Sequence, residues 1–381
     1  MLLTLYKSAL RPVEIKALLK LKIKGKTYAP PKEPLAVLAQ QLDDKTFCYA
    51  ALGKVSRSFS IVIQQLPEDL KDAVCVFYLV LRALDTIEDD MQFPLEQKLP
   101  LLETFHEKTS DEGFSLKGVG DQDDYRVLLE NYPKVVRMFK TLNKESQRTI
   151  VDITAQMGKG MADFSEKEIN QLTDFDLYCH YVAGLVGIGL SGLFVASNLE
   201  TLSLNNRGRN SNAMGLFLQK TNIIRDYHED LFAERTFWPK EIWSLYADNL
   251  DDFAKNPESK QSLSCLNHML SDALQHIPAC LEYLSYVKNN QVFRFTAIPQ
   301  IMAIATMAKL YNNPRVLKGV VKVRKGLAAK LMTYPVSMKD VNKYFEKGLR
   351  TIEKKASNGT PYAKETKQQI VAIRLKIQDL S

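Results

Sequence analysis

Apolar residues recur along this chain at the three- and four-residue intervals of amphipathic helices. From Leu35 onward nearly every stretch keeps this spacing, which predicts one helix after another. Short polar stretches interrupt the pattern at Pro94 and at residues 111–124, 204–211, 256–259 and 312–314. The chain has no series of β-branched runs separated by turns, and no alternation of strands with helices. The pattern therefore predicts an all-α fold.

The two ends of the chain differ from its helical middle. Prolines at positions 30, 31 and 34 separate a basic N-terminal segment, residues 1–34, from residues 35–355. We expect residues 35–355 to form a single all-α domain. Residues 357–361 read Ser-Asn-Gly-Thr-Pro and precede a last polar helix. Residues 356–381 are therefore assigned to a C-terminal linker and polar helix.

One uncharged stretch, from Leu177 to Leu199, is long enough to suggest a membrane span. It contains His180, Ser191 and four glycines, however, and acidic residues flank both of its ends. We therefore predict a buried core helix at this position. Another apolar helix is expected to begin near Pro299, with the proline in its first turn.

Composition narrows the choice of partners. With 381 residues, of which 45% are apolar, the chain can bury a large core as one helical domain or two smaller ones. The net charge of +7 is concentrated at Lys16, Lys20, Lys22, Lys24 and Lys26, and again at Lys318, Lys322, Arg324 and Lys325. Each basic cluster is either a solvated face or a site for lipid headgroups or a phosphorylated ligand. No basic–aromatic motif indicates nucleic acid.

The cysteines indicate a reducing compartment. Five of them are scattered along the chain and none forms a C-x-x-C pair. This spacing predicts free thiols and excludes a disulfide framework or a zinc site. The N-terminus lacks the apolar core and cleavage pattern of a secretory signal.

Two short acidic stretches share the pattern D-x-x-E-D. The first acidic motif is Asp85, Glu88 and Asp89, and the second is Asp226, Glu229 and Asp230. Positions i, i+3 and i+4 lie on one face of a helix, so we expect each trio to converge. Carboxylates about 6 Å apart repel by about 3 kcal/mol at an effective dielectric of about 20. Both motifs also follow apolar helical runs, at the end where the helix dipole disfavours negative charge.

A cation between the two motifs would offset this repulsion. Ligand sets made only of oxygen favour Mg²⁺, which binds a few carboxylates together with phosphate oxygens and water. A solvated acidic turn explains either stretch alone, whereas the duplication favours a metal. We therefore expect the two motifs to face one another across a dry helical pocket that holds magnesium.

Several other residues could bind phosphate. Ser56, Arg57 and Ser58 combine two hydroxyls with an arginine, which gives forked, charge-assisted hydrogen bonds. Such a triplet is also common on protein surfaces. Arg82 and Arg225 lie beside the acidic motifs, where each forms either a structural salt bridge or a partner for a departing diphosphate.

The glycines and aromatic residues give weaker signals. Residues 187–192 spell G-x-G-x-x-G, but neither a preceding strand nor a βαβ unit is visible, so we interpret the glycines as sites of close helix packing. Tyr178, Tyr181 and Leu185 share a face at helical spacing. They either pack in the core or line a cavity whose aromatic rings stabilise a carbocation. Together with metal-bridged carboxylates, these features suggest ionisation of an allylic diphosphate.

Longer motifs identify a family. The chain resembles the eukaryotic squalene synthases, a branch of the head-to-head isoprenoid synthases, from roughly Ala9 to about Ala329. The motifs lie at residues 55–59, 77–91, 178–187, 219–227 and 235–239. The resemblance implies a single-domain, all-α isoprenoid synthase fold whose helices surround a large central cavity. It also implies condensation of two farnesyl diphosphate molecules to presqualene diphosphate, and then reduction to squalene by NADPH.

The resemblance assigns roles to individual residues. Magnesium ligands are implied at Asp85, Glu88, Asp89, Asn222, Asp226 and Asp230. Substrate contacts are implied at Ser56, Arg57, Ser58, Phe59, Tyr78, Arg82, Gln219, Phe295 and Pro299. Cofactor contacts are implied at Arg57, Arg82, Arg225, Lys322 and Arg324. Tyr178 matches the tyrosine of the first condensation, as a base or a cation stabiliser, and Asp85, Asp226, Arg82 and Arg225 complete the catalytic set.

Three alternative functions would share part of this pattern. A phytoene or dehydrosqualene synthase would share the first step but use no hydride, and Lys322 and Arg324 favour squalene. A chain-elongating prenyltransferase would carry D-D-x-x-D motifs, which this sequence lacks. The non-enzyme alternative is a helical scaffold. Family members are anchored to the endoplasmic reticulum membrane facing the cytosol, but no such apolar run precedes Ser381, so we expect a soluble monomer.

Overall fold

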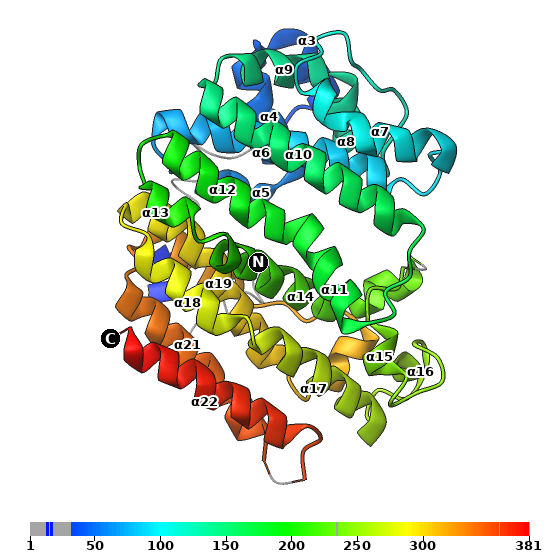
Figure 1. Ribbon diagram of the computed structural model, residues 1–381. Helices are drawn as coiled ribbons and strands as arrows, with labels where there is room; N and C mark the ends of the chain where they lie inside the picture. Colours follow the sequence, from blue (N-terminus) through cyan, green and yellow to red (C-terminus); the bar gives the residue numbers. More distant parts are fainter. Residues whose placement is uncertain (1–12, 15, 18–31, 234, 358, 381) are drawn as a thin grey trace. The chain divides into compact units, whose positions relative to one another are not determined.

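Helices form all the regular structure in the described part of the chain (Figure 1). The computed structural model describes residues 13, 14, 16, 17, 32–233, 235–357 and 359–380. No strand occurs among these residues. The all-α prediction is therefore confirmed.

Internal contacts divide the chain into two compact units. The first unit comprises residues 19–167 and 188–205, and the second comprises residues 1–18, 168–187 and 206–381. The expectation of one domain over residues 35–355, surrounding a central cavity, stays a prediction.

The first unit is built around α6. Its helices are α3 (Leu35–Gln41), α4 (Asp44–Val55), α5 (Arg57–Ile63), α6 (Glu68–Asp89), α7 (Leu95–Lys108), α8 (Asp123–Glu130), α9 (Tyr132–Lys140), α10 (Lys144–Ser165), most of α12 (Leu185–Ala196) and α13 (Leu202–Asn205). Helix α6 starts after Pro67 with Glu68 and Asp69 in its first turn, where the dipole favours acids. Helices α7 and α10 approach so closely that a Cβ at Gly158 would lie 2.1 Å from the Leu102 carbonyl oxygen.

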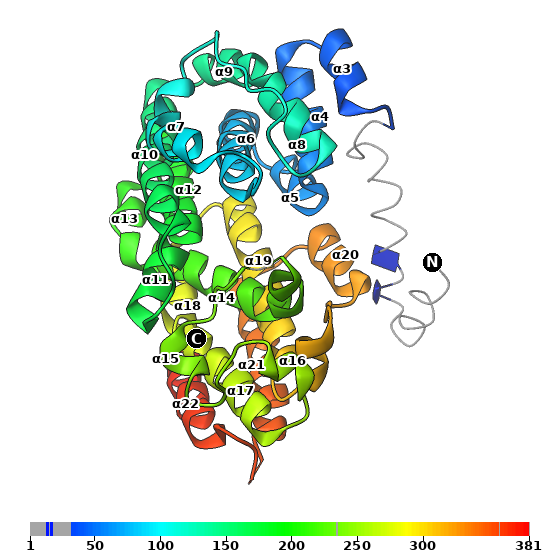
Figure 2. The same ribbon diagram turned by 90° about the vertical axis from the view of Figure 1, so that its right-hand side faces the viewer.

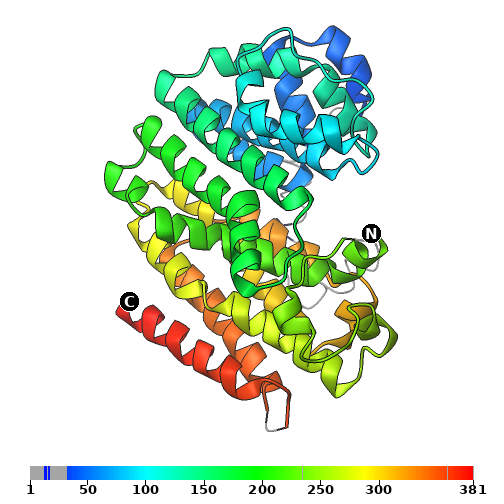
Figure 3. The same cartoon turned by 45° about the vertical axis from the view of Figure 1, so that its right-hand side comes forward.

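The second unit is organised around α14 (Gly208–Phe232). The other elements are α11 (Leu172–Cys179), the π-helix η1 (His180–Gly184), α15 (Lys240–Trp243), α16 (Asp252–Lys255), α17 (Lys260–Leu274), α18 (Ile277–Tyr286), α19 (Asn290–Leu310), η2 (Pro314–Lys318), α20 (Lys325–Thr333), α21 (Met338–Lys355) and α22 (Ala363–Asp379). Helix α14 packs against η1, α17, α18 and α19. Figure 3 shows α22, in red, alongside α21 and α17.

Most of the predicted breaks are confirmed. Those at Pro94 and at residues 256–259, and the described residues of 357–361, fall between helices, whereas 312–314 ends where η2 begins and 111–124 ends where α8 begins. The break predicted over residues 204–211 is wrong for most of its length because α14 begins at Gly208. The Ser211 hydroxyl donates to the carbonyl oxygens of Arg207 and Gly208, so this polar side chain finds its hydrogen-bond partners within the helix.

Pro299 also departs from its predicted position. The Asn289 side chain accepts hydrogen bonds from the backbone of Gln291 and Val292 and starts α19 at Asn290. Pro299 consequently lies inside α19 rather than in its first turn. Proline donates no intrahelical hydrogen bond, so local propensity disfavours this position, but α19 buries apolar side chains both before and after Pro299, such as Phe295 and Ile301, and this burial offsets the cost.

The long apolar stretch is only partly a core helix. The continuous helical run Leu172–Ala196 is long and apolar enough to cross a membrane, with a mean hydropathy of 1.7, and 39% of its most apolar window is buried. The glycines at positions 187, 189 and 192 lie in α12, and no strand precedes them in the described part of the chain. A Cβ at Gly187 would lie 2.3 Å from the Ser211 carbonyl oxygen, which confirms that close packing requires glycine here. All five cysteines are free and buried, as predicted.

Candidate functional site

In the first unit, predicted site residues lie along one stripe of α6. Tyr78, Arg82 and Asp85 follow one another at intervals of four and three residues, which places them on one face of the helix. The ring of Tyr78 lies 6.0 Å from that of Phe59 on α5. Arg82 Nη1 lies 3.5 Å from Asp85 Oδ2. The structure therefore brings four predicted residues together.

Arg82 is a largely buried cation with an unused donor. Its Nε is buried without a hydrogen-bond partner. Burial opposes the charged form, but Asp85 and Tyr78 outweigh this effect and raise the pKa of Arg82 above its ordinary value. The guanidinium carbon lies 5.1 Å from the ring centre of Tyr125, a residue for which the sequence gave no functional signal. A fixed cation with a free N–H suits an anionic oxygen.

Asp85 resists ionisation in this setting. Burial and the nearby Asp89 carboxylate raise its pKa to about 6, although Arg82 opposes the rise. The side chain retains 30% exposure. A carboxylate held at such a position is destabilised until a further cation approaches, which is typical of functional sites.

The next acidic residue, Asp90, has a structural role. Its Oδ2 accepts a hydrogen bond of 2.7 Å from the Gly120 amide, and its Oδ1 accepts one of 2.8 Å from the Gln92 amide. Burial alone would raise the pKa of Asp90, but these hydrogen bonds lower it below its ordinary value. Asp90 therefore anchors the loop that leads to Tyr125. Glu88 and Asp89 are partly exposed.

The Ser-Arg-Ser triplet lies at a helix break rather than within one helix. Ser56 separates α4 from α5 and has an irregular backbone with φ −152° and ψ 84°. The side chains of Arg57 and Ser58 lie outside the described part of the structure. Their predicted contacts therefore stay predictions. Phe59, the next residue, is 40% exposed.

In the second unit, α14 carries the other acidic motif. Gln219, Asn222, Asp226 and Asp230 lie on one face at intervals of three, four and four residues, and all are partly exposed. Glu229 is exposed. The face that could hold a ligand therefore combines two carboxylates with two amide side chains.

Arg225 forms a forked ion pair with its sequence neighbour Asp226. Arg225 Nε lies 2.7 Å from Asp226 Oδ1, and Nη2 lies 2.5 Å from Oδ2. Burial opposes the charge of Arg225, but Asp226 and the nearby Glu229 and Asp230 raise its pKa above the ordinary value. Arg225 therefore forms the structural salt bridge that the sequence gave as one of its two possible roles. A metal at Asp226 would have to share the carboxylate with Arg225 or displace it.

Tyr178 stacks on an aromatic partner that the sequence did not single out. Its ring centre lies 5.1 Å from that of Phe237, with 22° between the planes, and Tyr178 is 7% exposed. The π-helix η1 follows directly, so the face assumed for Tyr178, Tyr181 and Leu185 does not continue at α-helical spacing. In the sequence, Phe237 could have been identified from its place in the Arg-Thr-Phe-Trp-Pro motif.

A buried charge cluster holds α11, α14 and α17 together. Lys220 is completely buried, and its ammonium group pairs with Asp176 and lies 2.5 Å from Asp272 Oδ2. It also lies 4.9 Å from the ring centre of Phe175. Lys220 is two residues from Asn222, and Asp176 is two residues from Tyr178. The sequence reasoning missed this cluster because lysine is almost never fully buried.

The remaining predicted residues lie elsewhere in the second unit. On α19, Phe295 is buried and Pro299, one turn later, is partly exposed. Lys322 is exposed just before α20. Arg324 forms a forked ion pair with Glu14, at 3.0 Å between Nη2 and Oε1. This pairing was not expected from the sequence.

The donor types fit magnesium. Carboxylates and amide oxygens are the hard ligands that Mg²⁺ prefers, and it commonly takes only one or two protein carboxylates together with phosphate oxygens. Within the described residues, no group of three or more His, Cys, Asp or Glu side chains is placed to hold an ion. The two motifs lie in different units, so their facing one another stays a prediction, as do all the assigned roles.

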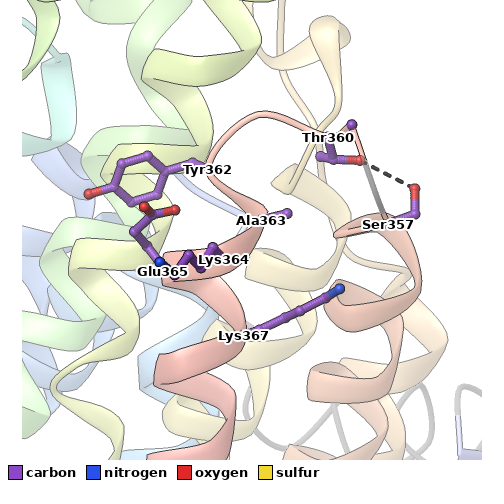
Figure 4. A pocket seen from close by; sticks show the side chains of 8 residues that line it. Ser357, Thr360, Tyr362, Ala363, Lys364, Glu365 and Lys367 are labelled. Atoms are coloured by element: carbon purple, nitrogen blue, oxygen red, sulfur yellow. Dashed lines mark hydrogen bonds between the residues drawn. The ribbon is translucent and has the colours of Figure 1, made fainter.

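Two pockets in the second unit are lined by none of the residues to which the family resemblance assigns a role. One, of about 480 Å³, surrounds the start of α22 and is lined by Lys364, Glu365 and Lys367 among others (Figure 4). The hydroxyl groups of Ser357 and Thr360, which line this pocket, are joined by a hydrogen bond. The other, of about 270 Å³, is lined by residues that include Glu258, Arg315 and Lys318.

Comparisons with known proteins point to one family. A family profile described as squalene/phytoene synthase matches residues 52–326. The squalene synthase of Rattus norvegicus is 46% identical over 363 residues, which cover 95% of this chain and 86% of the relative. Squalene synthase BSS of Botryococcus braunii is 55% identical over 76% of this chain. That match spans 64% of the relative, slightly under two thirds of its length.

Solved structures agree with these matches. The complex of TcSQS with the ligand BPH1237 superposes with a TM-score of 0.86 at 41% identity, covering 89% of this chain and 99% of that one. A dehydrosqualene synthase structure, at a TM-score of 0.50 and 20% identity, shares the fold alone. The fold is therefore the all-α isoprenoid synthase fold, and the chain belongs to the squalene/phytoene synthase family.

Proposed function

We propose that this chain is a squalene synthase. It would condense two farnesyl diphosphate molecules head to head, giving presqualene diphosphate, and then reduce and rearrange this intermediate to squalene with NADPH. The observation that carries the proposal is the 46% identity to the rat squalene synthase over 95% of this chain. The polar stripe of α6 supports it, because Arg82 and Asp85 there offer a cation and a carboxylate side by side.

In the first unit, residues of α6 would bind one diphosphate. The unused Nε of Arg82 would donate to a phosphate oxygen, while Tyr125 holds the guanidinium plane. Asp85, Glu88 and Asp89 are the proposed magnesium ligands of this motif. Magnesium, when bound, would neutralise charge on the departing diphosphate. The aromatic rings of Phe59 and Tyr78 would cover the adjoining hydrocarbon.

In the second unit, α14 would bind the other diphosphate. Asn222, Asp226 and Asp230 present oxygen donors on one face. Arg225 holds Asp226 in a fixed orientation and would donate its remaining N–H groups to the phosphate. Gln219 is the proposed substrate contact one turn earlier on this face.

Tyr178 is the proposed catalytic residue for the first condensation. Stacking on Phe237 fixes its ring, and the two parallel faces form an aromatic wall. Such faces stabilise a carbocation by about 0.5–2 kcal/mol per contact. Phe295 and Pro299 would line the hydrophobic pocket together with Phe59.

The proposed cofactor site is the basic segment before α20. Lys322 and Arg324 would bind phosphates of NADPH, which supplies a hydride for the second step. Arginine matches phosphate through its forked donors, and lysine adds a point charge. Arg57, Arg82 and Arg225 are further proposed cofactor contacts.

The reaction without hydride transfer is not favoured. The relatives that cover most of this chain are squalene synthases, whereas the dehydrosqualene synthase is similar in fold alone. Attachment to the endoplasmic reticulum membrane and a monomeric state stay proposals by resemblance to the family.

Product analysis tests the proposed function. The chain is incubated with Mg²⁺ and farnesyl diphosphate, with and without NADPH. With NADPH, squalene should form. Without it, squalene should be absent and presqualene diphosphate should accumulate. Formation of dehydrosqualene or phytoene-type products in the presence of NADPH would refute the proposal in favour of the alternative.

A further inference from the structure

The described part of the N-terminal segment carries a buried carboxylate. Residues 13, 14, 16 and 17 are helical. Glu14 and Ala17 are three residues apart and only 6% and 0% exposed, whereas Val13 is 48% exposed. Glu14 and Ala17 therefore belong to one buried face of this helical segment, which is part of the second unit.

Glu14 is paired with an arginine that lies 310 residues later in the chain. Arg324 Nη2 lies 3.0 Å from Glu14 Oε1, and Nε lies 3.4 Å from Oε2. These two contacts occupy the edge formed by Nε and Nη2, one of the two edges through which a guanidinium can bind a phosphate in bidentate fashion. Figure 2 shows the described N-terminal residues beside α20.

The segment around Arg324 is otherwise suited to an anion. Arg324 directly precedes α20, whose first backbone N–H groups carry the positive end of the helix dipole. Lys322 and Lys325 on either side are exposed. The Lys309 ammonium donates a 2.7 Å hydrogen bond to the Lys322 carbonyl oxygen and holds this backbone in place. The negative charge of Glu14 offsets part of the positive potential of this surface, which would otherwise attract phosphate.

We propose that Glu14 is an internal competitor for the phosphate that Arg324 binds. The inference rests on the proposed function, in which that phosphate belongs to NADPH. A phosphate cannot take the occupied edge of Arg324 while the Glu14 carboxylate remains there, because the two anions repel and need the same donors. Binding of the cofactor phosphate thus releases Glu14 together with the turn around it. By linkage, docking of this turn weakens cofactor binding by the same factor.

Calorimetric titration with NADP⁺ at fixed ionic strength tests the competition in the full chain. Glu14→Gln keeps the size of the side chain but removes its charge, so it should tighten NADP⁺ binding about tenfold, within the usual range of such couplings. Glu14→Asp, one methylene shorter, should tighten binding by a smaller factor. Glu33→Gln removes an exposed charge and serves as the matched control, with an expected change of less than about twofold.

A double-mutant cycle separates the competition from the cofactor assignment. Arg324→Gln should weaken NADP⁺ binding, and adding Glu14→Gln to it should have no further effect. If Arg324→Gln weakens binding but Glu14→Gln does not tighten it, the competition is refuted and the proposed function survives. If Arg324→Gln leaves binding unchanged, the cofactor assignment of Arg324 fails and the competition fails with it.

Hydrogen exchange gives a readout that does not depend on turnover. NADP⁺ should speed amide exchange at residues 13, 14, 16 and 17 of the unsubstituted chain, because this helical segment is released. Glu14→Gln should speed exchange at the same amides without any ligand. Slower exchange at residues 13, 14, 16 and 17 on adding NADP⁺ would show that this segment closes over the cofactor, and it would overturn the proposal.

Discussion

The substitution Asp85→Asn should stabilise the metal-free protein while abolishing its proposed activity. Asparagine resembles the protonated form of aspartate, and burial favours that form at this position by raising the pKa of Asp85 from 3.8 to about 6. At about 1.4 kcal/mol for each pH unit, the rise corresponds to about 3 kcal/mol. Since the side chain is 30% exposed, solvent screening reduces the expected gain to about 1–2 kcal/mol.

The pH dependence follows from the sign of the shift. Between pH 3.8 and about 6 the unfolded chain ionises Asp85 while the folded chain keeps it protonated, so wild-type stability falls as the pH rises through this window. Above about pH 6 the loss is complete. The stability difference between Asp85→Asn and wild type should therefore be largest at pH 8 and smaller at pH 5.

Urea unfolding in a metal chelator measures this difference at both pH values. Asp152→Asn removes an exposed carboxylate from α10 in the same unit and should change the free energy of unfolding by less than about 0.5 kcal/mol. Asp85→Asn should also form neither presqualene diphosphate nor squalene. A variant equal to or less stable than wild type at pH 8 would refute the reasoning about burial, and near-normal turnover would refute the metal role.

Three further substitutions test the second unit. Lys220→Met leaves the buried Asp272 carboxylate without its cation, which should lower the free energy of unfolding measured in urea by about 3–5 kcal/mol. Because burial already raises the pKa of Asp272, the loss should be smaller at pH 5 than at pH 8. Equal losses at the two pH values would contradict the ion-pair account. Phe237→Leu removes the ring stacked on Tyr178 and should slow formation of presqualene diphosphate about tenfold or more; an unchanged rate in single-turnover assays would show that stacking is not needed. Lys322→Ala should impair squalene formation mainly, and an equal fall in presqualene diphosphate would rule out its cofactor role.

Much of the local structure could be predicted from the sequence. Although no acidic trio is placed to hold an ion within the described residues, the spacing of apolar residues predicted the helices, and the four-residue spacing predicted that Asp226 and Asp230 share a face of α14. These predictions succeed because the relation between residues three and four apart is fixed by the geometry of the helix itself. They fail where packing overrides a local signal, as at Pro299, where side chains buried on both sides of the proline keep α19 continuous.

The functional residues that the sequence did not reveal are partners from distant parts of the chain. Phe237 stacks on Tyr178 across 59 positions of sequence, Asp272 reaches Lys220 across 52, and Glu14 reaches Arg324 across 310. No periodicity relates such positions. Their contact depends on how whole helices pack, and packing is set by the summed burial of many side chains.

The sequence by itself determined the helical class, the two acidic motifs and the family resemblance, because each is written in short-range spacing or in residue identity. Only the tertiary structure decided the state of each charged group. It partly buried Asp85 beside Arg82, paired Asp226 with Arg225 and paired Arg324 with Glu14. The energy of a charge depends on the solvent excluded around it and on the partners that folding brings near, and neither follows from the order of residues alone.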